Sequence, residues 1–276
     1  MRKLALSDEI LLKVDKAARY IGGEVNSVMK DKNAVDIRFA MCFPDVYEIG
    51  MSNLGMMILY NMFNQREDVW CERLFSPWPD LDKVMREKKI PLFALESQEP
   101  IRDFDFLGIT IGYEMCYTNI LQVLDLSGIP LKSADRGEDF PIVIGGGACA
   151  YNPEPLAPFF DMFYIGEGET VYDALFDAYK ANKKAGGSRR DFLLAAAKIP
   201  GIYVPSLYEV TYKEDGTIAS FAPTADGVPE KVQKQLIIDM EKEYRAVEAP
   251  VVPHIKATQD RVTLEIQRGC IRGCRF

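Results

Sequence analysis

Short, nearly continuous apolar runs alternate with helix-like stretches between residues 34 and 183. Strands that are apolar along their whole length are typical of parallel sheets, because helices cover both faces of such sheets. We therefore predict an α/β fold with an open, doubly wound parallel sheet, of the Rossmann or flavodoxin-like kind. The expected strands cover residues 35–43, 69–75, 91–95, 104–112, 141–147 and 161–169. The expected helices cover residues 52–65, 79–88, 117–128 and 170–181.

Residues 1–33 precede this domain and are expected to contain an amphipathic helix. Ser7 is a good residue to begin a helix and Gly22 a good residue to end one. The apolar residues at helical spacing between them are Ile10, Leu11, Val14, Ala18 and Ile21.

Two regions follow the predicted domain. Residues 184–260 are expected to form a hairpin extension and a polar connector, with Asp215-Gly216 at the tight turn of the hairpin. Residues 261–276 are expected to begin another domain, because "VTLEI" has the composition of a strand.

Composition excludes several classes of protein. A net charge of −8 argues against a general nucleic-acid surface, which needs a cationic footprint. No apolar stretch approaches the roughly 20 residues that span a bilayer, and no signal peptide is recognisable, so we expect a cytoplasmic protein that does not insert into membranes. In that compartment the six cysteines are expected to be reduced.

Four of the predicted strands end in unusual loops, at residues 43–55, 110–115, 144–155 and 165–169. Glycines in these loops let the backbone approach a ligand closely. The carboxyl ends of parallel strands share one edge of the sheet, so the loops predict a crevice for a flat or extended cofactor. A GxGxxG sequence does not follow the first strand, which makes a dinucleotide less favoured than another large cofactor.

At these loops the chain resembles the cobalamin-binding domain that precedes the catalytic barrel in cobalamin-dependent radical S-adenosylmethionine (SAM) proteins. The resemblance spans residues 35–182 and is greatest to an uncharacterised bacterial family. It implies that cobalamin binds to the loops. The implied cofactor-binding residues are Pro44, Asp45, Tyr47, Glu48, Gly50, Ser52, Asn53, Thr110, Gly112, Tyr113, Gly145, Gly146, Gly147, Pro153, Glu154, Gly166, Glu167, Gly168 and Glu169.

The resemblance departs from the best-known cobalamin fingerprint, Asp-x-His-x-x-Gly, at one position. Here the stretch reads Asp45 to Gly50, with Tyr47 where the fingerprint has histidine. A phenol with a pKa near 10 is a poor metal ligand at neutral pH. We therefore expect base-off cobalamin with no histidine beneath the cobalt, and Tyr47 against its lower face or holding a water there. His254 lies in the connector, and we interpret it as a surface residue.

The C-terminal sequence "RGCIRGCRF" resembles the start of the radical SAM motif Cys-x-x-x-Cys-x-aromatic-Cys. In that family three thiolates hold a 4Fe-4S cluster, whose open iron binds S-adenosylmethionine. The resemblance assigns Cys270 and Cys274 as metal ligands and Phe276 as the aromatic residue. The third cysteine would be residue 277. We therefore expect this chain to be the N-terminal part of a longer enzyme, whose catalytic barrel is its partner, and to be inactive alone.

Alternatives remain open from the sequence. The longer protein is expected to transfer a methyl or another group. The domain would otherwise be a binding or sensing module for cobalamin or a flavin, or an interaction domain without a cofactor. The acidic loop residues are a possible metal site, but we favour helix capping and contacts to corrin amides for them. These residues are Asp45, Glu48, Glu154, Glu167 and Glu169.

Overall fold

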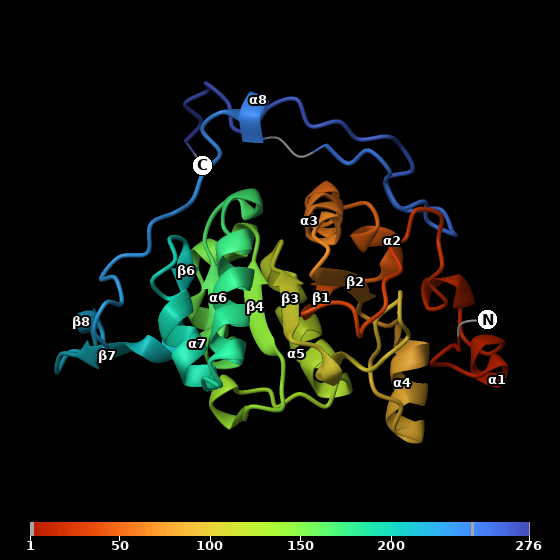
Figure 1. Ribbon diagram of the computed structural model, residues 1–276, viewed down its shortest axis with the longest axis horizontal. Helices are drawn as coiled ribbons and strands as arrows, with labels where there is room; N and C mark the ends of the chain where they lie inside the picture. The colour runs from red at the N-terminus through yellow and green to blue at the C-terminus, as the bar shows by residue number, and fades with distance from the viewer. Residues whose placement is uncertain (1–2, 244–245, 276) are drawn as a thin grey trace.

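The computed structural model describes residues 3–243 and 246–275. Among these residues, six strands form a central sheet in the order β2-β1-β3-β4-β5-β6 (Figure 1). The strands are β1 (Ile37–Phe43), β2 (Val69–Phe75), β3 (Phe106–Thr110), β4 (Ile142–Gly146), β5 (Met162–Tyr164) and β6 (Ile202–Tyr203). Strands β1 to β5 pair in parallel, and β6 pairs antiparallel with β5 at one edge. The predicted parallel α/β sheet is confirmed.

The strand order reverses between β1 and β3. The chain moves outward from β1 to β2 and then returns to the other side of β1. In open α/β sheets, ligands bind outside the carboxyl ends of the strands at such a reversal. The register places Met41 of β1 beside Gly108 of β3, and Thr110 of β3 beside Gly146 of β4. These residues therefore share the carboxyl edge of the sheet.

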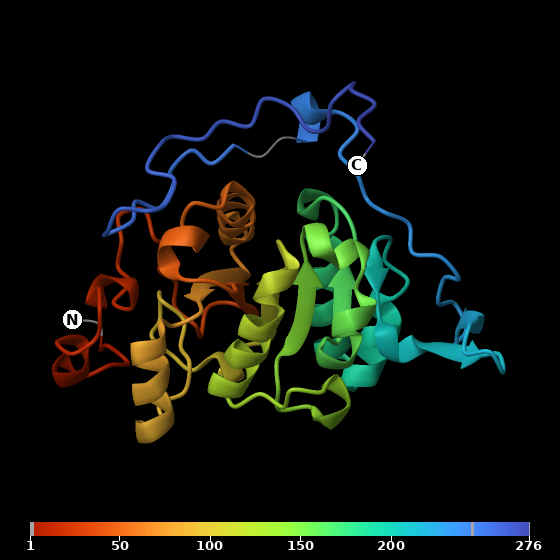
Figure 2. The same ribbon diagram turned by 180° about the vertical axis from the view of Figure 1, so that it is seen from behind.

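Helices cover both faces of the sheet (Figures 1 and 2). The α-helices are α1 (Asp8–Leu11), α2 (Tyr47–Gly50), α3 (Leu54–Gln65), α4 (Pro79–Lys88), α5 (Tyr117–Leu126), α6 (Tyr172–Lys184), α7 (Arg189–Ala196) and α8 (Met240–Glu243). Helices α3, α6 and α7 share one apolar core with Phe39 and Met41, whereas α4 and α5 share the other with Ala40 and Cys42. Successive side chains of a strand point to opposite faces, so β1 contributes to both cores.

Short 3₁₀ helices connect many of these elements. They cover Ala17–Arg19, Ile101–Asp103, Glu114–Cys116, Ser133–Asp135, Ala148–Tyr151, Glu154–Phe159, Gly168–Thr170 and Pro205–Leu207. Four of them lie in the loops after β3, β4 and β5, at the carboxyl edge of the sheet. The loops that were predicted to form a crevice are therefore ordered by local backbone hydrogen bonds.

Local sequence explains where the helices beside this edge begin. The side-chain oxygen of Asn53 accepts a hydrogen bond from the amide of Met56 (2.9 Å) and caps α3. Helix α7 begins with a capping box, in which Ser188 and Asp191 each accept a hydrogen bond from the other's backbone amide. Helix α7 and the short strand β6 after it were not predicted.

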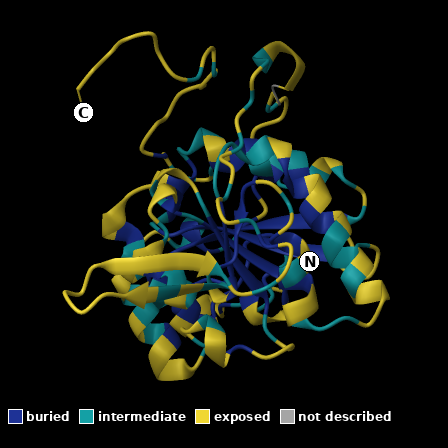
Figure 3. Cartoon of the chain, turned by 90° about the vertical axis from the view of Figure 1, so that its left-hand side faces the viewer, coloured by how far each residue is buried: buried dark blue, intermediate teal, exposed yellow. Residues whose placement is uncertain are grey.

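Beyond the sheet, the predicted hairpin is confirmed as β7 (Tyr208–Tyr212) and β8 (Ile218–Pro223), joined by the turn at Gly216. The connector after it passes over the carboxyl edge of the sheet (Figures 1 and 2). It is largely exposed, whereas the strands beneath it are buried (Figure 3). None of the described helices has the length and apolar character that would let it cross a lipid bilayer.

Three predicted elements are wrong. The N-terminal helix is reduced to α1 and a 3₁₀ turn, because Lys16 adopts a left-handed conformation (φ 52°) and Arg19 turns inward to pair with Glu48. Residues 92–95 are buried, but Phe93 forms only an isolated bridge with Pro100, across a turn in which Gln98 has a φ angle of 65°. Residues 262–266 do not pair with any described strand and are largely exposed.

Candidate functional site

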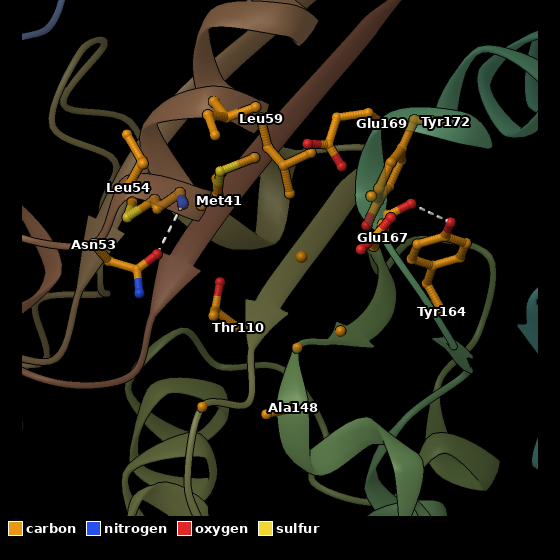
Figure 4. A pocket seen from close by; sticks show the side chains of 18 of the residues that line it. Met41, Asn53, Leu54, Leu59, Thr110, Ala148, Tyr164, Glu167, Glu169 and Tyr172 are labelled. Atoms are coloured by element: carbon orange, nitrogen blue, oxygen red, sulfur yellow. Dashed lines mark hydrogen bonds between the residues drawn. The ribbon is translucent and has the colours of Figure 1, made fainter. Parts of the chain in front are cut away.

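A pocket of about 510 Å³ lies at the carboxyl ends of β1, β3, β4 and β5 (Figure 4). Cofactor and small-molecule sites usually have volumes of about 300–1,000 Å³. The pocket is beside the reversal in strand order between β1 and β3. This protein therefore has a pocket at the place where open α/β sheets generally bind their ligands.

The inner wall of the pocket is mostly apolar. Met41 reaches it from β1, Ile144 from β4 and Tyr172 from α6. Leu54 and Leu59 of α3 close one side (Figure 4). A ligand would therefore bury an apolar body against this wall.

Glycines bring backbone to the pocket surface. A Cβ atom added at Gly112 or Gly146 would meet no other atom within 4 Å, so both positions are open toward the pocket that they line. Gly147 and Gly166 have positive φ angles of 102° and 137°. A Cβ atom at Gly147 would lie 2.9 Å from the carbonyl oxygen of Ile111, so this loop requires glycine.

The polar groups of the pocket are placed on opposite sides of it. Figure 4 shows Asn53 and Thr110 on one side, and Glu167 and Glu169 on the other. The hydroxyl of Tyr164 donates a hydrogen bond to the carbonyl oxygen of Glu167 (2.5 Å) and thereby fixes this loop. The walls therefore offer mainly oxygen acceptors to a ligand.

Arg268 is the cation among the described residues that line the pocket. Its guanidinium donates hydrogen bonds to Glu169 (2.5 Å) and Glu265 (2.8 Å), and it lies 3.6 Å from a carboxylate oxygen of Glu167. The hydrogen bonds to Glu265 and Glu169 raise the pKa of Arg268. Glu265 and Arg268 were missed, because nothing in "TLEIQRG" indicates which surface this segment contacts.

About half of the predicted cofactor-binding residues line the pocket. They are Asn53, Thr110, Gly112, Gly146, Gly147, Gly166, Glu167, Gly168 and Glu169. The others lie elsewhere: Pro44, Asp45, Tyr47, Glu48, Gly50, Ser52, Tyr113, Gly145, Pro153 and Glu154. The difference is greatest in the fingerprint-like stretch from Asp45 to Gly50, in which none of the predicted residues lines the pocket.

Tyr47 is buried in α2 and does not line the pocket. Its hydroxyl donates a hydrogen bond to Glu24 (3.0 Å) and accepts one from the backbone amide of His254 (3.2 Å). Burial, and next the charge of Glu24, raise the pKa of Tyr47, so the phenol stays neutral. The expected position of Tyr47 against the lower face of a cofactor is therefore corrected.

Glu48 is also turned away from the pocket. It accepts hydrogen bonds from Arg19 (2.8 and 2.9 Å) and from Lys16 (2.9 Å). Burial alone would raise the pKa of Glu48, but these hydrogen bonds outweigh it and lower the pKa to about 2. Glu48 is therefore an ionised structural group.

Other predicted residues hold the loops in place. Tyr113 donates a hydrogen bond to Asp45 (2.5 Å) and so joins the loops after β3 and β1. Tyr203 donates one to Glu154 (2.6 Å). Gly145 faces the opposite core, where a Cβ atom would lie 2.8 Å from Phe163.

The cysteines are free thiols. Cys42, Cys71 and Cys116 are buried and Cys149 is half-buried, whereas Cys270 and Cys274 are exposed. Within residues 3–243 and 246–275, no group of three or more His, Cys, Asp or Glu side chains is arranged to hold a metal ion. The two C-terminal cysteines therefore do not form a complete cluster site, and Phe276 lies outside the described residues.

Three comparisons with known proteins bear on this site. The profile of a family described as "Radical SAM proteins, N-terminal" matches residues 55–205. Uncharacterized protein MJ0966 of Methanocaldococcus jannaschii is 24% identical over 238 residues, which are 86% of this chain and 40% of that protein. The chain thus spans less than half the length of this relative.

Two solved structures of a radical S-adenosylmethionine methyltransferase, TsrM from Kitasatospora setae, are also similar. One contains tryptophan substrate and a SAM analog; it is 16% identical, with a TM-score of 0.36 over 71% of this chain and 36% of that one. The other contains cobalamin and a 4Fe-4S cluster; it is 14% identical, with a TM-score of 0.37 over 72% of this chain and 31% of that one.

Proposed function

Because the chain belongs to the family of N-terminal regions of radical SAM proteins, we propose that it is the cofactor-binding part of a longer radical SAM enzyme. We propose further that its strand-end pocket holds part of a corrinoid such as cobalamin. The observation that carries the proposal is the position of the pocket. It lies at the reversal in strand order, and open glycine backbone and an apolar wall surround it.

The residues of the pocket fit a corrinoid in two respects. Gly112 and Gly146 leave backbone open, so a bulky, flat group can approach the sheet edge without meeting side chains. The carboxylates of Glu167 and Glu169 and the hydroxyl of Thr110 are acceptors for the amide N–H groups at a corrin periphery. These residues would bind and orient the group, and Leu54 would help to exclude water.

The charge of the pocket disfavours a flavin nucleotide as its ligand. Three carboxylates line it against one guanidinium, and Arg268 is already hydrogen-bonded to two of them. A terminal phosphate would meet repulsion from Glu167, Glu169 and Glu265. The uncharged amide groups at a corrin periphery would not meet this repulsion.

A histidine ligand to cobalt is not supplied by the described residues of the pocket. Tyr47 is buried elsewhere, and the Nε2 atom of His254 lies 3.1 Å from the carbonyl oxygen of Gly22. We therefore propose that a corrinoid binds base-off without a histidine from this chain. A bound cobalamin would supply a transferable methyl or other group to the longer enzyme.

The radical chemistry is proposed for the longer enzyme only. Cys270 and Cys274 match two of the three cysteines of the family motif, whose third position would be residue 277. Soft thiolate ligands suit an iron–sulfur cluster. Since these cysteines alone do not complete a site, the chain is expected not to cleave S-adenosylmethionine.

A pair of glycine substitutions tests the corrinoid site. The chain is mixed with hydroxocobalamin and desalted, and its visible spectrum is recorded. We expect the wild-type chain to retain the corrinoid and Gly146→Leu to lose it, because leucine would project into the pocket. The matched control is Gly137→Leu, at another open glycine that does not line the pocket.

A wild-type chain that retains no corrinoid would overturn the cobalamin assignment. Retention of a flavin instead would identify a flavin-binding module. Equal retention by the wild-type chain and Gly146→Leu would place the site elsewhere on the molecule. Circular dichroism of both variants shows whether they have kept the fold.

A further inference from the structure

Residues 250–268 run from the N-terminal segment and α2 over the carboxyl edge of the sheet to the loop after β5, and Glu265 and Arg268 line the pocket there (Figures 1 and 2). We call this segment the strap. We infer that the strap gates the pocket: Arg268 is a clasp that must release Glu169 before a large ligand enters or leaves, while the other end of the strap stays fixed. The inference concerns the site of the proposed function, but the clasp exists independently of which ligand binds.

The fixed end of the strap lies on the N-terminal segment and on α2. Val252 donates a backbone hydrogen bond to Val25 (3.0 Å), and the side chain of Asn26 donates one to the carbonyl oxygen of Pro250 (2.9 Å). Val251 is 7% exposed and belongs to the same apolar core as α3. Apolar burial therefore supports these hydrogen bonds.

Two residues of the fingerprint-like stretch, and Ser52 just after it, form the rest of this anchor. Tyr47 accepts a hydrogen bond from the amide of His254 (3.2 Å), and the carbonyl oxygen of Glu48 accepts one from Thr258 (3.0 Å). The hydroxyl of Ser52 accepts one from Gln259 (2.9 Å). The stretch thus holds the strap instead of the cobalt.

Among the described residues, the contacts that attach the other end of the strap are those of charged side chains. Val262, Leu264 and Ile266 are at least 77% exposed, so apolar packing does not hold this part of the strap. Arg268 reaches across to Glu169, whose side chain is 7% exposed, in the loop before α6. Glu265 holds the guanidinium from the strap itself (2.8 Å).

The two ends therefore differ in the kind of attachment. The anchor combines backbone hydrogen bonds with a buried side chain, whereas Arg268, the clasp, is held by ion pairs and its side chain is 20% exposed. Water reaches this side chain and can replace its carboxylate partners, so the clasp can open without unfolding of the anchor. Glu265 and Arg268 both belong to the strap and both line the pocket. Opening of the clasp would therefore move these two residues away from the pocket together.

The first test needs no ligand. We expect trypsin to cleave after Arg261 about two- to fivefold faster in Arg268→Gln than in the wild-type chain, as expected for the loss of one such ion pair. Arg272→Gln is the matched control, because Arg272 is an exposed arginine that does not line the pocket. The charge swap Arg268→Glu with Glu169→Arg is expected to restore the wild-type rate.

Access to the pocket is measured separately with the substitution Thr110→Cys, because Thr110 lines the pocket wall. Peptide-resolved mass spectrometry follows its reaction with N-ethylmaleimide. We expect this reaction to be faster when Arg268→Gln is also present, and the association rate of hydroxocobalamin to rise in parallel in Arg268→Gln.

Each outcome decides part of the inference. An unchanged cleavage rate after Arg261 would overturn the clasp. Faster cleavage with an unchanged maleimide reaction at residue 110 would overturn gating. If the wild-type chain does not bind hydroxocobalamin, the proposed function fails, whereas the cleavage and maleimide results still decide the clasp and the gate.

Discussion

Tyr47 shows how a residue can match a motif by position and yet have another role. It occupies the place of histidine in a cobalamin fingerprint, but it is 1% exposed and packs edge-on against Phe75 with ring centroids 5.3 Å apart. Its hydroxyl joins Glu24 to the backbone of His254. Position 47 therefore connects the N-terminal segment, α2 and the strap.

We predict that Tyr47→Phe lowers the free energy of unfolding by about 1–3 kcal/mol, because buried polar partners lose a hydrogen bond. Urea denaturation, followed by circular dichroism, measures this change. Tyr212→Phe is the control, since Tyr212 is 65% exposed and the change should stay within about 0.5 kcal/mol. An equally small effect of Tyr47→Phe would show that the hydroxyl does not join these segments.

Strand β2 carries a buried charge network at its centre. Arg73 donates hydrogen bonds to Glu24 (2.7 and 3.2 Å) and to Glu96 (2.6 Å), and the side chains of all three are fully buried. Burial opposes the charge of Glu24, yet Arg73 outweighs it and lowers the pKa of Glu24. The network attaches the N-terminal segment and the turn at Glu96 to the sheet.

We predict that Arg73→Met lowers the free energy of unfolding by about 3–5 kcal/mol, because two buried carboxylates lose their cation. The triple variant Arg73→Met, Glu24→Leu and Glu96→Leu should recover part of this loss. Urea denaturation of both variants tests the prediction. If Arg73→Met unfolded at the same urea concentration as the wild-type chain, the network would not be a structural connection.

The sheet and most of its helices were predictable because they depend on local patterns. The apolar runs at 35–43, 69–75 and 104–112 contain β1, β2 and β3, and the helix expected at 79–88 is α4. One of the wrong elements was decided by a distant partner instead. The helix expected after Ser7 gives way to pairing of Arg19 with Glu48, 29 residues away.

The candidate site was predictable where glycine and strand ends define it. Gly112, Gly146 and Gly166 line the pocket as expected, since the carboxyl ends of parallel strands meet at one edge. The contribution of Arg268 was not predictable, because it depends on a contact with Glu169 across 99 residues. No local pattern specifies such a contact.

In the whole molecule, the N-terminal segment and the C-terminal strap meet beside the carboxyl edge of the sheet. The N-terminal segment at Val25 pairs with the strap at Val252, and the strap then crosses to the loop after β5 (Figure 2). The exposed Cys270 follows this crossing directly. In the proposed longer enzyme, the strap would therefore place the cysteine motif beside the pocket.

The position of cobalt in crystals of the chain grown with hydroxocobalamin tests the central claim most directly. Anomalous scattering at the cobalt absorption edge locates the metal without reference to any expected ligand. We predict one peak at the mouth of the strand-end pocket, on the side of Gly112 and Gly146, and away from Tyr47 and His254. A peak elsewhere on the molecule, or corrinoid-free crystals grown at saturating hydroxocobalamin, would contradict the account.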